Sequence, residues 1–201
     1  MHKLFLALLG IFGAAFPAVS FSAEPTQAGA SDEALCAALS DGLKPSRLRP
    51  NTNAKVREVI EGIAPERVPA RLVVCSGYNP YTAAAQKIEN LTGIRDSGWV
   101  VAFDDQFFRE APEYVFRATM AHEIGHLVLN EACRNTKAVS QCEHQIDVFA
   151  STLVGKCAVV RSIEWFVKYS KRRSKPTYAR HYQLLRALFG QERECGGKTT
   201  P

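Results

Sequence analysis

The chain has 201 residues, of which 46% are hydrophobic and 22% are charged, and its formal net charge is +5. This composition excludes an intrinsically disordered chain, and the length suits one domain with a sizeable core. The charge is uneven, because residues 24–155 hold 13 Lys and Arg against 17 Asp and Glu, whereas residues 156–201 hold 11 against 3. The basic C-terminal part is expected to be a solvated helix end or to touch an anionic surface; no nucleic-acid partner is expected, and the oligomeric state is not indicated.

Residues 1–22 have the pattern of a secretory signal peptide, with a positive charge, an uncharged apolar run and small residues before the cleavage region. Pro17 interrupts the apolar run, so we expect cleavage; an uncleaved membrane anchor is the alternative. An even number of cysteines in an exported chain predicts three disulfides and a periplasmic or secreted protein. Spacing suggests one pair, Cys133 with Cys142, as a clamp on a loop between two helices.

Residues 23–53 are expected to form an N-terminal leader with a short helix, and residues 54–201 the main domain with basic helices at its C-terminal end. Ser31 is a suitable N-cap for the first helix because acidic residues follow it. The elements expected before the central motif are, in chain order, a helix after Ser31, a loop at 41–53, a helix at about 54–62, a strand at 70–76, a helix at 81–90 and a strand at 97–105.

Two longer helices follow. The stretch at 111–130 has Pro112 in its first turn and apolar residues at helical spacing, and the stretch at 141–155 repeats this pattern up to Gly155, a C-terminal stop. Further helices are expected at about 157–170 and 177–189. The sequence therefore predicts an α+β fold that is dominated by helices and contains a small sheet.

The first of these long helices carries the sequence HEIGH, an H-E-x-x-H motif. His122 and His126 are four residues apart, so a helix projects both imidazoles from one face toward a single ion. Glu123 is one step round the helix, where its carboxylate can accept a proton from a water molecule activated by the metal. The motif therefore predicts a Zn²⁺ site with a catalytic glutamate.

A catalytic zinc needs a third protein ligand and one open position. The downstream candidates are Glu131, Cys133, Cys142, Glu143, His144 and Asp147. The cysteines are better explained as a disulfide, and Glu131 lies near the helix end and cannot easily turn back. Glu143 and Asp147 lie four residues apart on one face of the next helix, so Glu143 can be the third ligand. Asp147 can then accept a hydrogen bond from the outer nitrogen of a ligating histidine.

These two motifs, HEIGH and EHQID followed by VFA, resemble the gluzincin metallopeptidases. Within them the pattern is similar to the HtpX and CAAX-prenyl-protease group and to small HExxH domains of the ImmA/IrrE type, over roughly residues 71–155. The resemblance implies a zincin-like fold, Glu143 as a zinc ligand and Asp147 as the support of a histidine. It also implies that the strand at Trp99 to Phe103, before the active helix, is an exposed edge that pairs with an extended substrate.

The chain departs from that group after the second helix. The HtpX group commonly shows a His-Pro element and an Arg there, whereas this chain reads SKPTYARHY. The candidates for a group that stabilises the oxyanion or contacts the substrate are Tyr178, Arg180, His181 and Tyr182. The HtpX group also has several membrane helices, whereas this chain has at most its signal segment.

The sequence thus favours an exported zinc-dependent endopeptidase acting on a peptide or protein substrate. The alternative is a secreted, disulfide-stabilised binding or inhibitory domain whose metal site is structural or vestigial. A third possibility is an inactive precursor in which the leader covers the cleft and Cys36 caps the zinc, although a disulfide is the expected state of Cys36.

Overall fold

The computed structural model describes residues 29–93, 97–134, 139–172 and 195, and only the backbone at 130–134, 139–141 and 170–172. The expected signal peptide at 1–22 lies outside the described residues. Within the described ranges no helix combines the length and apolar character that crossing a membrane requires. The elements in chain order are α1 (Asp32–Gly42), β1 (Arg47–Pro50), α2 (Ala54–Ile63), β2 (Leu72–Tyr78), β3 (Ala83–Lys87), α3 (Ile88–Thr92), β4 (Trp99–Asp104), α4 (Asp105–Glu110), α5 (Glu113–Arg134), α6 (Val139–Val154) and α7 (Lys156–Arg172).

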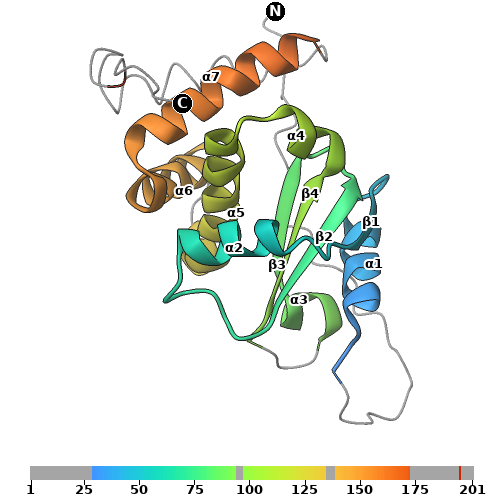
Figure 1. The fold of residues 1–201 in the computed structure, drawn as a ribbon. Helices are drawn as coiled ribbons and strands as arrows, with labels where there is room; N and C mark the ends of the chain where they lie inside the picture. Colours follow the sequence, from blue (N-terminus) through green and yellow to red (C-terminus); the bar gives the residue numbers. More distant parts are fainter. Residues whose placement is uncertain (1–28, 94–96, 135–138, 173–194, 196–201) are drawn as a thin grey trace, which may run out of the picture.

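The fold is α+β with a small mixed sheet, as the sequence predicted, and the strand order is β1-β2-β4-β3 (Figure 1). The two central strands, β2 and β4, run parallel, and the two outer strands pair antiparallel with them. The strand from Trp99 to Phe103, expected at an edge, therefore lies in the middle of the sheet. All six residues of β4 are buried. An apolar run buried on both faces suits an interior strand, which explains the difference.

The edge strand next to the H-E-x-x-H helix is β3 instead. The expectation of a helix at 81–90 was wrong in its first half, because Ala83–Lys87 pairs antiparallel with β4 and only Ile88–Thr92 is helical. Alanine favours helices, but propensity is a weak tendency that pairing with a neighbouring strand can override. β3 packs against α5, so the sheet presents this outer strand beside the helix that carries both histidines.

The opposite edge also differs from the expectation. The predicted loop at 41–53 contains β1, which pairs with β2 from Arg47 opposite Tyr78 to Pro50 opposite Cys75. β2 continues through Gly77, where a Cβ would lie 2.1 Å from the carbonyl oxygen of Arg47. Only glycine allows the two strands to approach so closely, and the expected stop at Gly77 is therefore part of the strand.

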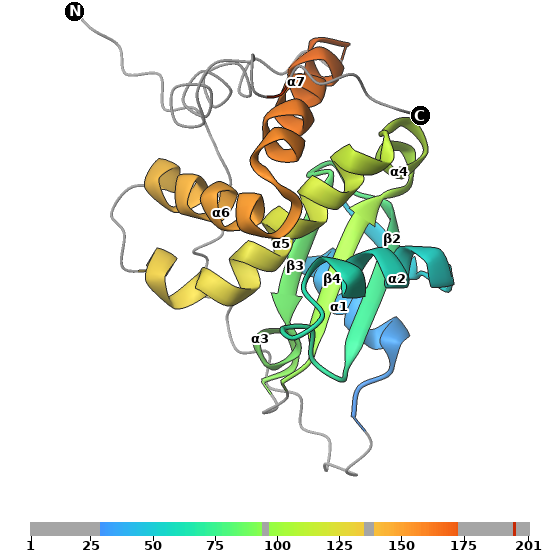
Figure 2. The same ribbon diagram turned by 60° about the vertical axis from the view of Figure 1, so that its left-hand side comes forward.

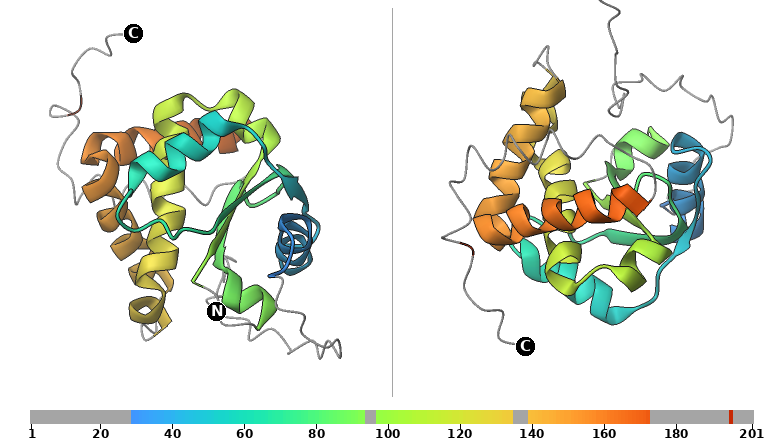
Figure 3. Two further views of the ribbon diagram at one scale, coloured as in Figure 1. Left: turned by 60° about the horizontal axis from the view of Figure 1, so that its bottom comes forward. Right: turned by 90° about the horizontal axis from the view of Figure 1, so that it is seen from above.

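Helices cover both faces of the sheet (Figures 2 and 3). Alternate side chains of the central strands point to opposite faces, so Val73 and Val100 pack with α1 and α3, whereas Val74 and Val101 pack with α2 and α5. The predicted N-cap of α1 is confirmed, since the Ser31 hydroxyl oxygen accepts a hydrogen bond from the amide of Ala34 at 3.2 Å. The N-terminal elements α1 and β1 thus belong to the same sheet and hydrophobic core as the elements that follow them.

Candidate metal centre

α5 positions the two histidines and the glutamate between them. Its first turn begins at Pro112, whose carbonyl accepts the amide of Phe116, and its apolar side buries Met120 and Ile124 in the core. The helix ends at Arg134, so Glu131 lies in its last turn, near the helix end as the sequence suggested. The side chain of Glu131 lies outside the described residues.

α6 packs along α5 and brings two acidic side chains to the histidines. Ile146 and Ala150 are fully buried on the side of α6 that faces the core. Glu143 and Asp147 lie at i and i+4, so one face of the helix presents both carboxylates to α5. The residues that the sequence placed on two separate helices therefore meet in space.

Three possible ligand atoms converge at this contact. His122 Nε2 lies 3.2 Å from His126 Nε2 and 3.2 Å from a carboxylate oxygen of Glu143. The same Glu143 oxygen lies 3.8 Å from His126 Nε2. Since zinc binds nitrogen and oxygen at about 2.0–2.1 Å, ligand atoms at tetrahedral angles lie about 3.3 Å apart. The spacing fits a tetrahedral metal site, and the group can hold a metal ion.

Asp147 orients the first histidine. Its Oδ1 lies 2.8 Å from His122 Nδ1, and a carboxylate accepts the Nδ1–H proton. A neutral His122 that donates from Nδ1 has its lone pair on Nε2, which is the atom that faces His126 and Glu143. Asp147 thus selects the tautomer that a metal site requires. The side chain of Asp147 is buried, with only 5% exposed.

Without a metal, burial and mutual interactions shift the pKa values of His122, His126 and Glu143. Burial lowers the pKa of His122, but hydrogen bonds with Asp147 and Glu143 outweigh burial and raise it well above 6.5. Burial, together with the charge of His122, lowers the pKa of His126 to about 4, although the charges of Glu143 and Asp147 oppose this. Burial raises the pKa of Glu143, yet its hydrogen bond with His122 brings the result below 4.5. The site therefore combines an ionised Glu143 with a neutral His126, both of which can coordinate a cation.

Glu123 behaves differently from the ligand group. Burial, followed by repulsion from Glu143, raises its pKa from 4.5 to about 7, although attraction to His122 opposes this. Its carboxylate does not belong to the cluster of converging ligand atoms. A half-buried carboxylate with a pKa near neutrality is suited to exchanging protons rather than to holding a cation.

The cluster remains open on one side. The side chains of His122, His126 and Glu143 are 23%, 33% and 26% exposed to solvent. Among the described residues, no fourth His, Cys, Asp or Glu joins them. The partial exposure of these three side chains leaves a metal held there accessible to solvent.

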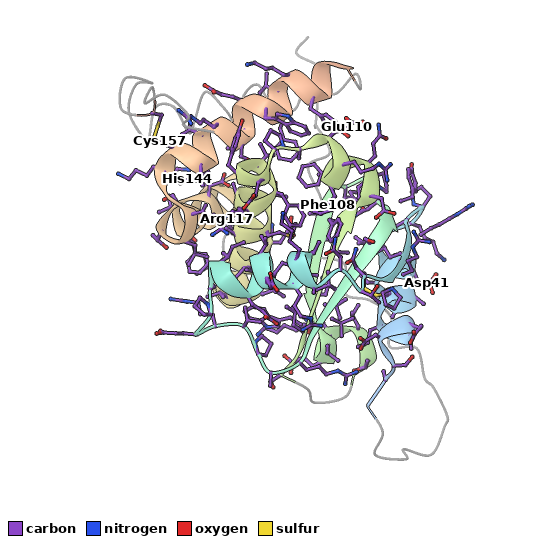
Figure 4. The ribbon with its side chains drawn as sticks, viewed as in Figure 1. Asp41, Phe108, Glu110, Arg117, His144 and Cys157 are labelled. Carbon is purple, nitrogen blue, oxygen red and sulfur yellow. A yellow bond between two sulfur atoms is a disulfide. The ribbon has the colours of Figure 1, made fainter. Side chains whose placement is uncertain are left out.

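Other predicted site residues do not join this cluster or cannot be placed. His144 follows Glu143 on α6 and is half-buried (Figure 4). Cys142 is disulfide-bonded, but the side chain of Cys133 lies outside the described residues, so their pairing stays a prediction. The candidates for oxyanion or substrate contacts, Tyr178, Arg180, His181 and Tyr182, also lie outside the described residues.

Two disulfides are described in full. Cys36 pairs with Cys75, as expected for a bonded Cys36, and Cys157 pairs with Cys195 (Figure 4). Cys36 is therefore bound to the sheet and is not a ligand of the metal centre. Two such bonds indicate an oxidising environment.

No family model, curated protein or solved structure matches this chain. The resemblance to gluzincins therefore depends on the two sequence motifs alone. The geometry of α5 and α6 is sufficient to define a candidate metal centre at His122, His126 and Glu143.

Proposed function

We propose that the protein is an exported, zinc-dependent endopeptidase with a zincin-like active site. The observation that carries this proposal is the convergence of His122 Nε2, His126 Nε2 and a Glu143 oxygen at 3.2–3.8 Å, with Glu123 beside them but outside the ligand set. Two imidazoles and one carboxylate are a donor set that suits zinc.

Each residue of the site has a distinct task. His122, His126 and Glu143 hold the metal, and Asp147 keeps His122 in the tautomer that offers Nε2. Bound zinc supplies a Lewis acid that polarises the scissile carbonyl and acidifies water. Because these residues lie on two packed helices rather than on loops, their positions are fixed before substrate arrives.

Glu123 moves the proton. Its carboxylate accepts a proton from the attacking water and donates it to the leaving amine when the peptide bond breaks. In the absence of metal its pKa is about 7, because burial disfavours its charge. A bound dication would favour the ionised form, which is the state that a general base needs.

The position of β3 supports a peptide substrate. β3 is one of the two outer strands of the described sheet, and it is the one that packs against α5. Its outer edge, unpaired within the described sheet, is therefore available near the helix that carries the H-E-x-x-H motif. An extended peptide can add to such an edge through main-chain hydrogen bonds, which hold it without requiring a particular sequence. This strand takes the role that the sequence assigned to Trp99–Phe103.

The open side of the cluster favours an enzyme over a binding or inhibitory domain with a structural metal. Such a domain would complete the coordination sphere with a fourth side chain, and cysteine is a usual ligand of structural zinc. Cys36, Cys75, Cys142, Cys157 and Cys195 are all disulfide-bonded and so do not offer a thiolate. The same bonds support export to an oxidising compartment.

The test measures metal content and peptide cleavage on the same purified mature protein. Wild type should contain zinc and cleave members of a peptide library. His122→Ala should lose the metal, whereas Glu123→Gln should keep it and lose cleavage by a factor of about 10²–10⁴. Glu113→Gln, an exposed glutamate in the first turn of the same helix, is the matched control and should change neither.

The outcomes separate the two functions. Full cleavage by the Glu123→Gln protein would falsify the assignment of the general base. Zinc bound by wild type without cleavage of any peptide would favour the binding domain.

A further inference from the structure

α5 and α6 approach each other closely inside the H-E-x-x-H motif, at Gly125. A Cβ built on Gly125 would lie 2.9 Å from Ile146 Cγ2, 3.3 Å from Phe149 Cδ1 and 3.5 Å from the Ile146 carbonyl oxygen. By contrast, a Cβ on Gly62, the glycine of helix α2, meets nothing within 4 Å. α6 therefore occupies the space that a side chain at position 125 would need.

Ile146 cannot move aside easily. It is fully buried, and its Cγ2 is bonded directly to Cβ, so this methyl group follows the helix backbone. β-branched residues in helices also have one strongly preferred χ1 rotamer, which removes the option of turning the methyl group away. A methyl group at position 125 would thus push α6 away from α5.

α6 carries the two carboxylates of the metal centre on either side of this contact. Glu143 precedes Ile146 by three residues, and Asp147 follows it directly. Metal–ligand distances tolerate deviations of only about 0.2 Å. A displacement of α6 by a few tenths of an ångström would therefore disturb Glu143 and the hydrogen bond between Asp147 and His122 together.

Glycine is also an unfavourable residue inside a helix, because it loses more backbone freedom on folding than alanine does. Gly125 lies well inside the 22 residues of α5, so its presence calls for a reason in packing. The close approach of Ile146 supplies that reason. It does not require Gly125 to touch the substrate or the metal.

We propose that Gly125 is a positioning residue that sets the distance between α5 and α6 at which Glu143 meets His122 and His126. This inference rests on the zinc site proposed above. Gly125 itself offers no ligand atom, yet it controls metal affinity through the distance between the two helices.

The test compares zinc affinity in four variants, measured by competition with a chromogenic chelator on folded protein. Gly125→Ala should weaken zinc binding about 10- to 100-fold, the range seen when groups that orient metal ligands are lost. Gly62→Ala is the matched control and should leave affinity unchanged. Ile146→Leu removes Cγ2 at nearly constant volume, so the double variant Gly125→Ala/Ile146→Leu should regain most of the affinity.

Thermal unfolding with excess chelator, measured in parallel, separates positioning from general damage. If Gly125 positions α6, Ile146→Leu should raise zinc affinity in the Gly125→Ala protein. This gain should exceed the change that Ile146→Leu causes in the wild-type protein. Unchanged affinity in Gly125→Ala, or no recovery in the double variant, overturns the inference.

If Gly125→Ala does not fold, the double variant decides. Folding with the zinc affinity of Ile146→Leu supports the proposed contact, and failure to fold or to bind zinc overturns it. A wild-type protein that binds no zinc refutes the metal site itself, which is a different result from wild-type binding that Gly125→Ala leaves intact.

Discussion

The two faces of the sheet are built for different purposes. On the α1 face, a cluster of buried apolar side chains packs around the Cys36–Cys75 bond, which ties α1 to the central strand β2. On the other face, α5 and α6 bury or half-bury His122, Glu123, Glu143 and Asp147 within a largely apolar surround. Apolar burial stabilises a fold, whereas clustered ionisable groups cost free energy unless they are paired or bind a metal.

This difference indicates where the protein gives up stability for chemistry. The α1 face is held by a covalent bond and by packing, neither of which depends on pH or metal. At the α5–α6 contact, the carboxylates of Glu143 and Asp147 pair with His122, and on the proposed function a bound cation would stabilise this contact further. If this contrast holds, changes on the first face lower the free energy of unfolding without altering metal affinity, whereas changes to the ionisable residues of the second face mainly alter metal affinity or the dependence of stability on pH.

The largest expected effect tests the α1 face. Replacing both cysteines, Cys36→Ala with Cys75→Ala, should lower the free energy of unfolding by about 3–4 kcal/mol, because the bond closes a loop of 39 residues. Zinc affinity of the folded protein should stay within a factor of about two. Denaturant unfolding and a zinc competition assay measure the two quantities.

The second disulfide provides the matched control. Cys157 and Cys195 are 38 residues apart, so loop entropy alone predicts the same loss for Cys157→Ala with Cys195→Ala. Cys36 and Cys75 are completely buried, whereas Cys157 and Cys195 are half-buried. A larger loss at the first pair measures the contribution of burial. A large fall in zinc affinity after removal of Cys36–Cys75 would contradict the separation of the two faces.

The sequence predicted the metal-centre region better than the sheet, for a physical reason. The spacing of His122 and His126, and of Glu143 and Asp147, is a local property of a helix, so it can be read along the chain. Which two helices pack together was inferred from their apolar faces. The hydrogen bond from His122 to Asp147 is the geometric consequence of that packing.

The strands depend on partners far away in the sequence. β1 is recognisable only through β2, and β3 only through β4, because neither short segment has a strong strand pattern of its own. The central position of β4 follows from strand order, which the sequence does not encode locally. The contact at Gly125 was missed for the same reason, although a glycine inside a buried helix was a visible signal.

The next prediction ranks three acidic residues of α5 and α6. Glu143→Ala should weaken zinc binding more than 100-fold, because it removes a ligand, and Asp147→Ala should weaken it about 10- to 100-fold, because it removes only the orientation of His122. Glu131→Ala should have little effect, since Glu131 lies five residues beyond His126 on the same helix and is rotated about 140° from it. A zinc titration of the three variants at one pH gives the order.

This ranking also tests the contrast between the faces. With chelator present, Glu143→Ala should lower the free energy of unfolding at neutral pH, though by less than loss of the Cys36–Cys75 bond does, because the hydrogen bond with His122 that holds the pKa of Glu143 below 4.5 also stabilises the fold. Loss of metal in Glu131→Ala together with retention in Glu143→Ala would show that the two-helix site is wrong.

The smallest effect concerns the stability of the metal-free protein at different pH. Burial raises the pKa of Glu123 from 4.5 to about 7 in the folded state, while in the unfolded chain the carboxyl ionises near its ordinary value. Between these two values the folded state holds a proton that the unfolded state has lost. Stability therefore falls as the pH rises through this window, and the loss is complete above about pH 7.

Glu123→Gln removes this loss, because glutamine has no charge to bury. With chelator present, the variant should be more stable than wild type by about 1–2 kcal/mol at about pH 8, and the difference should shrink toward zero near pH 4. Urea unfolding at the two pH values measures it. A wild-type protein that is at least as stable as the variant at the higher pH would mean that Glu123 is stabilised as an anion in the metal-free fold. The proposed general base would then carry no cost in stability, and the contrast between the two faces would fail at the residue where it should be clearest.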